Sequence, residues 1–155
     1  MLSTEDFLRV VRDAPLVSLD LIARDPSGRI LLGLRENRPA QGSWFVPGGV
    51  IRKDELLDQA FRRISDTELG VPLERADARL IGVYEHLYPD NFADQPGFGT
   101  HYIVLAHEIR LGSRPARLPI EQHRAYRWVD VEQLASDSTV HAYSRAYAQV
   151  LSLAT

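Results

Sequence analysis

A Pro-Gly-Gly stretch followed by a single capped helix constrains the fold of this chain more than any other feature. Residues 47–49 are Pro-Gly-Gly, and a helical pattern opens at Asp54-Glu55, runs to about residue 69 and ends at Gly70. Glycine at positions 48 and 49 allows a tight bend and a close approach of the backbone to a ligand. We therefore predict a bend and a helix that together form one side of a ligand site.

One carboxylate continues the apolar stripe of this helix. Leu57, Phe61, Ile64 and Glu68 are separated by four, three and four residues, so they share one helical face. An unpaired carboxylate is costly to bury, and a metal ion or an arginine would supply the missing positive charge. The alternative is that Glu68 lies past the last buried turn and is solvated, as glutamates usually are. The other motif residues, all in register, favour the ligand site.

The full set of spacings resembles the signature of the Nudix hydrolases. That signature is Gly, five residues, Glu, seven residues, Arg-Glu, an apolar residue, any residue, Glu-Glu, any residue, Gly and an apolar residue. The matching residues are Gly49, Glu55, Arg63, Glu68, Gly70 and Val71. Ile64 and Thr67 replace two of the three clustered carboxylates, and Ser65 replaces the apolar residue. Since attack on phosphorus in that family uses the missing carboxylates, the resemblance implies a different reaction here.

The same resemblance implies a divalent cation, Mg²⁺ with Mn²⁺ as an alternative. Glu68 and a backbone carbonyl at Gly49 are the expected ligands, and Mg²⁺ usually takes its other ligands from water and substrate phosphate. Glu55 and Arg63 are expected to brace the loop against the helix. The alternative is a surface ion pair worth at most about 1 kcal/mol.

Segments outside the motif resemble the GDP-mannose mannosyl hydrolases, a branch of the Nudix family, and the similarity covers nearly the whole chain. These segments are Pro15–Asp20, Asn37–Gly42, Asp90–Phe92, Thr100–Tyr102, Glu121–His123 and Val140–Tyr147. Members of this branch cleave the carbon–oxygen bond of the sugar instead of a phosphorus–oxygen bond. The resemblance implies that water attacks the anomeric carbon of GDP-mannose, with inversion, and releases GDP and a free hexose. GDP-glucose is an alternative substrate.

This resemblance also assigns roles to individual residues. His123, on a mobile loop, is the implied general base, a role suited to an imidazole with a pKa near neutrality. Neighbouring Gln122 is the implied third metal ligand. Arg35 and Arg63 are expected to stabilise the charge that grows on the departing GDP. Asp20 is expected to accept hydrogen bonds from sugar hydroxyls or to hold an arginine; the alternative is a side chain on the wet face of a sheet.

Further residues are expected to bind the substrate. They are Arg35, Arg38, Arg52, His86, Tyr102 and Tyr126. His86 is expected to neutralise the departing phosphate, whereas the alternative for His86 and Tyr102 is a packed position on a long strand. The related sequences carry arginine directly after Gly-Gly, where this chain has Val50. Arg52 is one replacement for it; a slower reaction and another substrate are the other two interpretations.

Two other functions stay open. An ordinary Nudix pyrophosphatase would give GMP and hexose 1-phosphate, which the losses at Ile64 and Thr67 disfavour. A catalytically inactive Nudix domain would only bind a nucleotide sugar, which the retained Gln122 and His123 disfavour.

The strand and helix pattern predicts a single Nudix hydrolase domain, residues 1–155, of the α+β or α/β class. Strands are expected at 17–23, 29–35, 44–46, 79–88, 100–110 and 126–129, with helices at 3–12, 54–69 and in two pieces after 129. Because these elements mix without a repeat, we expect a Nudix-type mixed β-sheet sandwiched between α-helices.

Composition excludes several classes of function. The net charge is −3, which argues against binding nucleic acid or a membrane surface through bulk charge. The chain has no cysteine, so it has neither disulfides nor a thiolate zinc site. It also has no apolar run long enough to span a bilayer. A cytoplasmic protein is expected, and the family resemblance implies a homodimer, with the N-terminal helix as one candidate for its interface.

Overall fold

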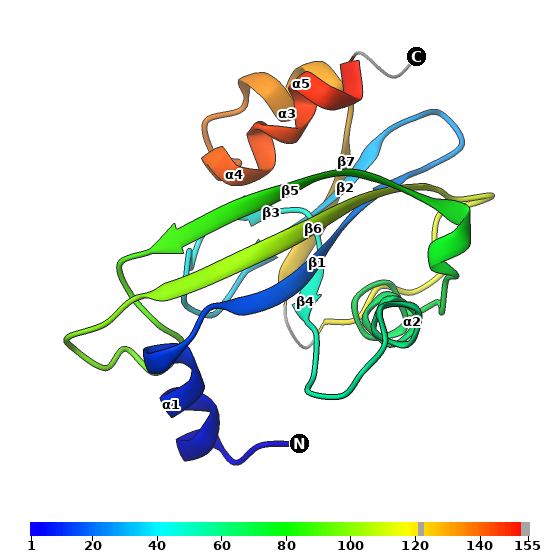
Figure 1. Cartoon of the computed structure of the whole chain (residues 1–155). Helices are drawn as coiled ribbons and strands as arrows, with labels where there is room; N and C mark the ends of the chain where they lie inside the picture. Colours follow the sequence, from blue (N-terminus) through cyan, green and yellow to red (C-terminus); the bar gives the residue numbers. More distant parts are fainter. Residues whose placement is uncertain (121–122, 153–155) are drawn as a thin grey trace.

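The computed structural model describes residues 1–120 and 123–152, which form a mixed sheet between two groups of helices (Figure 1). Its elements in chain order are α1 Thr4–Asp13, β1 Leu16–Arg24, β2 Ile30–Arg35, β3 Trp44–Phe45, β4 Gly48–Val50, α2 Leu57–Leu69, a 3₁₀ turn Arg75–Asp77, β5 Ala78–Tyr88, β6 Thr100–Arg110, β7 His123–Val129, α3 Val131–Ser136, α4 Ala142–Arg145 and α5 Tyr147–Ser152. The predicted sheet and helix sandwich is confirmed.

The sheet divides around β1. The strand order is β3-β2-β1-β6-β5, while β4 also pairs with β1 and β7 pairs with β2. β1 runs parallel to β6 along its whole length, and the other pairs are antiparallel. The first half of β1 bonds to β4, whereas its end meets β2 only at Arg24 and Ile30. The sheet is therefore open between β2 and the start of β1.

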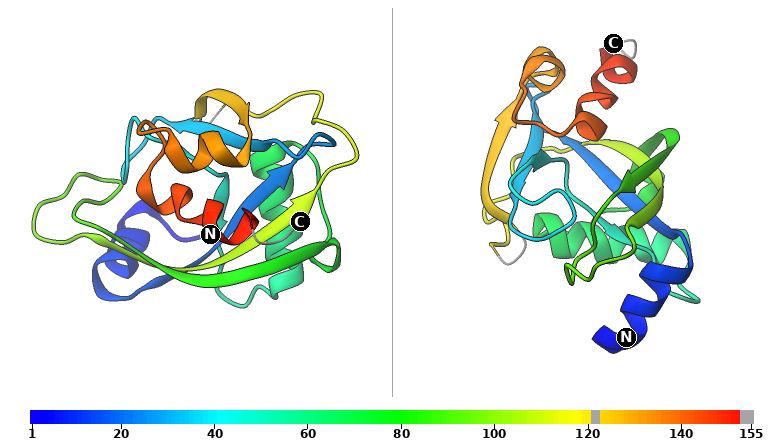
Figure 2. Two further views of the ribbon diagram at one scale, coloured as in Figure 1. Left: turned by 90° about the horizontal axis from the view of Figure 1, so that it is seen from above. Right: turned by 90° about the vertical axis from the view of Figure 1, so that its left-hand side faces the viewer.

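Two apolar cores lie on opposite faces of the sheet. On one face, Phe61, Ile64 and Leu69 of α2 pack against Leu19 and Leu21 of β1. On the other face, α3 and α5 cover the sheet with a core whose buried members include Ile22, Leu32, Leu134, Tyr147 and Leu151. Figure 2 shows the same layers from two further directions, with α1 standing at the rim.

Three predictions of local structure are wrong. Gly48 and Gly49 are not a bend but belong to β4, where they pair with Asp20 and Leu19. His123 is not on a loop: it is the first residue of β7 and pairs with Arg35. The last predicted helix is two shorter helices, α4 and α5. Each error involves a partner far away in the sequence or a local break that periodicity does not reveal.

Helix α1 packs on its own domain. The Ser3 side chain caps it by accepting a hydrogen bond from the Asp6 amide, as expected at a helix start. Val11 is buried, and the Phe7 ring lies 5.2 Å from the Phe92 ring. Among the helices of the described residues, none is long and apolar enough to cross a membrane.

Candidate active site

A cavity of about 460 Å³ opens where the sheet divides. It is walled by β1, β4, α2, the loop after β2, and the ends of β5 and β6. Most of the residues predicted for the site line it: Asp20, Arg35, Arg38, Gly49, Arg52, Arg63, Glu68, His86 and Tyr102. The sequence prediction that these distant segments meet in one place is confirmed.

Glu55 and Arg63 form the expected brace. Arg63 Nε donates to Glu55 Oε2 at 2.7 Å, and its NH2 group donates to Glu55 Oε1 at 2.8 Å and to the Val50 carbonyl at 2.9 Å. The same carboxylate accepts from the Arg52 amide at 3.0 Å. These contacts, the Arg63 hydrogen bonds first, lower the pKa of Glu55 to about 2. Arg63 thus ties α2 to the end of β4 while one side of it faces the cavity.

Glu68 is a buried carboxylate at the base of the cavity. Only 4% of it is exposed, and its Oε2 lies 3.3 Å from Nε2 of His123. The His123 ring is equally buried and lies over Gly33, where a Cβ would come within 2.5 Å of Nδ1. Within the described parts of the chain, Nδ1 has no hydrogen-bond partner. His123 stands behind Glu68 and does not itself line the cavity.

Asp20 faces the cavity, which excludes the alternative of a side chain on the wet face of the sheet. Its Oδ2 accepts a hydrogen bond from the Tyr147 hydroxyl at 2.6 Å. Burial raises the pKa of Asp20 to about 7; the Tyr147 hydrogen bond and Arg35 act against this, and Glu68 adds to it. Part of the Asp20 population is therefore protonated at neutral pH.

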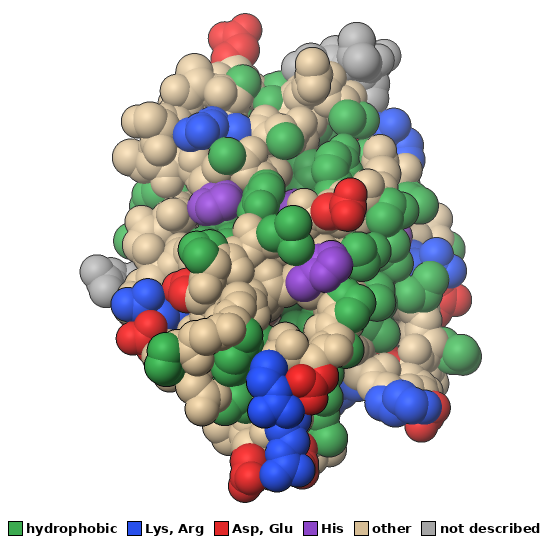
Figure 3. Space-filling view, turned by 60° about the vertical axis from the view of Figure 1, so that its left-hand side comes forward, with side chains coloured by type: hydrophobic (Ala, Val, Ile, Leu, Met, Phe, Trp, Pro, Cys, Tyr) green, Lys and Arg blue, Asp and Glu red, His purple; other side chains and the backbone are tan. Residues whose placement is uncertain are grey.

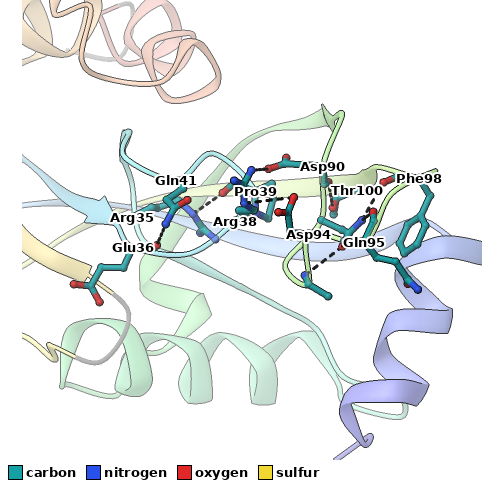
Figure 4. Close-up of polar contacts among 12 residues, drawn as sticks. Arg35, Glu36, Arg38, Pro39, Gln41, Asp90, Asp94, Gln95, Phe98 and Thr100 are labelled. Atoms are coloured by element: carbon teal, nitrogen blue, oxygen red, sulfur yellow. Dashed lines mark hydrogen bonds and ion pairs between the residues drawn. The ribbon is translucent and has the colours of Figure 1, made fainter.

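The arginines of the cavity are held by different partners. Arg35 Nε donates to the Pro39 carbonyl at 3.0 Å, which points its guanidinium along the cavity wall. Arg38 pairs with Asp90 at 3.2 Å and with Asp94 at 3.7 Å, joining the loop after β2 to the loop after β5 (Figure 4). An arginine compensated in this way binds a phosphate less strongly than a free one, so Arg35 is the stronger candidate.

Aromatic rings form the wall opposite α2. His86 is buried and stacks on Tyr143, with ring centres 4.2 Å apart and planes 5° apart. Burial, with a smaller contribution from His141, lowers the pKa of His86 to about 4. Without a bound anion this imidazole is neutral at pH 7, and the role of His86 toward a departing phosphate stays a prediction. Tyr88 and Tyr102 complete the wall, edge to face at 6.0 Å.

Sequence reasoning missed four lining aromatic residues, one of which is Phe45 of β3. Phe7 of α1 and Phe92 of the loop after β5 lie at the mouth of the cavity, and Tyr88 lies inside it. Strand alternation contains a signal for Tyr88, because residues 86 and 88 lie on the same face of β5. Nothing in the sequence indicates that α1 reaches the cavity.

Two residues predicted for the site, Tyr126 and Gln122, are not among the described residues that line the cavity. Tyr126 does not line the cavity: its hydroxyl donates to the Pro119 carbonyl, and its ring packs near His123. Its prediction as a substrate-binding residue is wrong for this structure. Gln122 lies outside the described residues.

The β4 ladder distinguishes the two glycine carbonyls. Leu21 donates to the Pro47 carbonyl and Ile51 donates to the Val17 carbonyl, and such bonds recur at every second residue of an antiparallel strand. Gly49 is in phase with these bonds, so its carbonyl is directed to β1. The carbonyls of Gly48 and Val50 are out of phase and point away from β1, and that of Val50 accepts from Arg63 on α2. Of the two glycine carbonyls, that of Gly48 is therefore the one directed away from β1.

A family model described as the NUDIX domain matches residues 15–150. The chain belongs to the Nudix domain family. A curated relative, the low-salt glycan biosynthesis protein Agl8 of Haloferax volcanii, is 44% identical over 108 residues. That match covers 69% of this chain and 66% of the relative, which is just under two thirds of its length.

Solved structures agree with this family at the level of the fold. The MutT NUDIX hydrolase of Burkholderia pseudomallei is 26% identical, with a TM-score of 0.69 over 92% of this chain and all of that one. The MutT protein of Methanosarcina mazei Go1 is 21% identical, with a TM-score of 0.72 over 92% and 96%. The NUDIX domain of Shewanella oneidensis NrtR, solved with ADP ribose, is 17% identical, with a TM-score of 0.67 over 99% and 100%.

The three residues that depart from the Nudix signature have different environments in the structure. Ile64 is buried in the α2 core, and a Cβ on Gly49 would come within 3.2 Å of it. Ser65 is also buried; it donates to the Arg62 carbonyl and accepts from the Leu73 amide. Thr67 is exposed at the cavity. An apolar side chain thus fills the place of one lost carboxylate, and no acid replaces it there.

The donors present fit a divalent cation that shares its coordination with a substrate. In residues 1–120 and 123–152, no three histidine or acidic side chains group closely enough to hold a metal ion alone. Two carboxylates, Asp20 and Glu68, nevertheless line one cavity, and Glu68 contributes to the raised pKa of Asp20. Carboxylate and carbonyl oxygens are hard donors that suit Mg²⁺, which completes its shell with water and substrate phosphate.

Proposed function

We propose that this protein is a Mg²⁺-dependent hydrolase of GDP-mannose, with GDP-glucose as the alternative substrate. Water attacks the anomeric carbon from the face opposite GDP, the bond between that carbon and the β-phosphate oxygen breaks, and the electron pair leaves with GDP. The water proton passes to a general base. The products are GDP and a hexose of inverted configuration.

One observation carries this proposal. Ile64 and Thr67 stand where Nudix enzymes have the carboxylates used to attack phosphorus. Asp20, Arg35 and Glu68 nevertheless line one cavity. A mere binding module has no need of a buried carboxylate beside a neutral imidazole wall. Arginines that can bind a diphosphate and a carboxylate that can accept hydrogen bonds from hydroxyl groups line the same cavity, which suits a nucleotide sugar.

Two of the related proteins support the substrate class. The relative Agl8 is named for glycan biosynthesis, a process that uses activated sugars. The NUDIX domain of NrtR was solved with ADP ribose, which is a sugar joined to a nucleoside diphosphate. We extend this class of ligand to the present chain.

The charged residues have separate roles in the proposal. Arg35 and Arg63 stabilise the negative charge on the leaving GDP, and Arg52 takes the place of the arginine that Val50 replaces. Glu68, the Gly48 carbonyl and Gln122 are the residues that would hold Mg²⁺. When bound, the ion supplies Lewis-acid stabilisation of the leaving diphosphate.

His123 remains our candidate for the general base. Its imidazole contacts Glu68 at 3.3 Å, so its position depends on the residue that holds the cation. In this structure the ring stands behind Glu68, and transfer of a proton from water requires it to turn toward the cavity. Apo enzymes often show catalytic contacts that tighten only with substrate bound.

We also propose that the protein acts as a cytoplasmic homodimer. The apolar side of α1 is used within its own chain, whereas the outer face of the edge strand β5 exposes Leu80, Val83 and Leu87 by more than half. Figure 3 shows hydrophobic side chains and histidines in the middle of one face of the molecule, with arginine, lysine and acidic groups gathered below them. Light scattering coupled to size exclusion tests this state, and a monomer at micromolar concentration contradicts it.

The deciding experiment follows the reaction by ³¹P NMR in water enriched in ¹⁸O, with Mg²⁺ and GDP-mannose. We expect GDP without the label and a labelled sugar, which places the attack at carbon. GMP and mannose 1-phosphate, with the label on phosphate, would instead identify a pyrophosphatase. If neither GDP-mannose nor GDP-glucose turns over, the proposed substrates are wrong; other nucleotide sugars are then tested, and failure of all of them would identify a binding module.

A further inference from the structure

The Asp20 carboxylate is held from a helix that lies far along the chain. Tyr147 begins α5, and its hydroxyl donates to Asp20 Oδ2 at 2.6 Å across 127 residues of sequence. Tyr147 has no exposed surface, while Asp20 lines the cavity. A hydrogen bond to a carboxylate is shorter and stronger than one between neutral groups. This contact therefore joins the C-terminal core directly to the cavity.

The packing around Tyr147 fixes the position of its hydroxyl. The side chain belongs to the core formed by α3, α5 and the sheet, and the Tyr84 ring meets it edge to face at 4.9 Å. A buried tyrosine usually finds a hydrogen-bond partner for its hydroxyl. Here the partner is Asp20, so movement of that carboxylate would leave a buried hydroxyl unpaired.

The backbone of Gly48 lies against the second carboxylate oxygen of Asp20, Oδ1, and restricts its movement. An ideal Cβ on Gly48 would come within 2.5 Å of Asp20 Oδ1 and within 2.5 Å of the Leu19 carbonyl. Asp20 and Gly48 are paired residues of β1 and β4, so their relative position is set by the sheet. The carboxylate thus lies between a strand backbone and a buried hydroxyl, with Oδ2 already occupied.

We propose that Tyr147 is a positioning residue that orients Asp20 so that its Oδ1 accepts a hydrogen bond from a hydroxyl group of the sugar. This inference rests on the proposed function, because it assigns the hexose to the Asp20 end of the cavity. A carboxylate would repel the diphosphate, whereas Arg52 and Arg63 in the same cavity attract it. Arg35, which interacts electrostatically with Asp20, is assigned to the junction of sugar and diphosphate. The sugar, a neutral polyol, is the part of the substrate that Asp20 can bind.

A binding experiment tests the inference without turnover. GDP and GDP-2-deoxy-2-fluoromannose, whose sugar bond resists cleavage, are titrated into the Mg²⁺-loaded protein in a calorimeter. In Tyr147→Phe, we expect the affinity for the sugar-bearing ligand to fall by about threefold to tenfold, the worth of one hydrogen bond. Affinity for GDP stays within twofold. Equal loss for both ligands, or no loss for either, overturns the inference.

Tyr84→Phe is the matched control. It removes a hydroxyl from the ring that packs on Tyr147, but this hydroxyl makes no bond to Asp20, so both affinities stay unchanged. A double-mutant cycle separates positioning from general packing. In an Asp20→Ala background, Tyr147→Phe has no further effect on the sugar-bearing ligand if it acts through Asp20, and an additional loss overturns the inference.

The outcome for Tyr147 can be separated from that for the proposed function. If the NMR experiment identifies GMP as the product, the assignment of attack at carbon fails, yet the two-ligand comparison still tests the sugar contact. If the wild-type protein binds GDP and the fluorinated ligand equally, Asp20 makes no net contact with the sugar and the inference on Tyr147 is wrong.

Discussion

Two acid–base pairs each include one residue of α2, and they differ in how completely their hydrogen-bonding groups are satisfied. Glu55 and Arg63 are joined by two short hydrogen bonds and are further bonded to backbone groups of Val50 and Arg52. Glu68 has a single 3.3 Å contact with His123, whose other ring nitrogen is buried without a partner among the described residues. The first pair holds the loop, whereas the second has donors and acceptors left for a ligand.

Loss of the Glu68 charge should have the largest effect. We expect Glu68→Gln to abolish both activity and its dependence on Mg²⁺, because this residue supplies the carboxylate at the base of the cavity. Its free energy of unfolding should change little. The rate of GDP formation, measured at increasing Mg²⁺ concentrations, reports this effect. Normal activation by Mg²⁺ would show that the metal binds elsewhere.

Replacement of His123 should come next. His123→Asn removes the base but keeps a polar side chain of similar reach, and we expect kcat to fall by about two to four orders of magnitude. His123→Ala should lower kcat as much, with some loss of stability from the space left over Gly33. Circular dichroism controls for the fold. Turnover near that of the wild type would exclude His123 from the mechanism.

Disruption of the satisfied pair should affect stability more than chemistry. The folded-state pKa of Glu55, about 2, is below the ordinary value of 4.5. Its stabilisation is therefore complete above pH 4.5 and is lost as the pH falls toward 2. Glu55→Gln should lower the free energy of unfolding by on the order of 2 kcal/mol at pH 7, mostly through a largely buried ion pair.

The same variant gives the matched control for Glu68→Gln. Urea unfolding at pH 7 and at pH 2 should show a difference between wild type and Glu55→Gln that disappears in acid. The Mg²⁺ dependence of activity should be retained. A pH-independent difference would mean that the pair does not stabilise the fold through its charge.

Restoration of one lost carboxylate should have the smallest effect on the reaction. Ile64 lies between the two pairs on α2, and Ile64→Glu puts an acid back beside Gly49. We expect no switch to GMP, because positioning a water molecule against phosphorus requires more than one carboxylate, and we expect some loss of stability from burying the charge. ³¹P NMR of the products provides the measurement. GMP as the main product would refute this expectation.

The sequence predicted the parts of the site that depend on local spacing. The Glu55–Arg63 brace, the burial of Glu68 on the apolar stripe and the cap at Gly70 all follow from residues within one helix and its flanks. The family resemblance placed His86 and Tyr102 in the substrate pocket, and strand positions suggested Asp20 and Arg35. The structure brings all four into one cavity.

The errors have a common physical origin in contacts between distant segments. The Gly48-Gly49 stretch is a strand only because β1 is there to pair with it, and His123 is in a strand only because β2 offers Arg35. The low pKa of His86 depends on its burial under Tyr143, which comes 57 residues later. Such environments cannot be obtained from the spacing of residues within one segment.

The pairing of β1 with β6 also sets an order of events for a chain that is being synthesised. Asp20 is paired with Ala106, and its carboxylate is bonded to Tyr147. The strand that carries Asp20 must therefore wait for more than 80 residues before its parallel neighbour exists, and contacts of such long range form slowly. An emerging chain can form α2 and its brace early, but it acquires an ordered cavity only after α5 has been made.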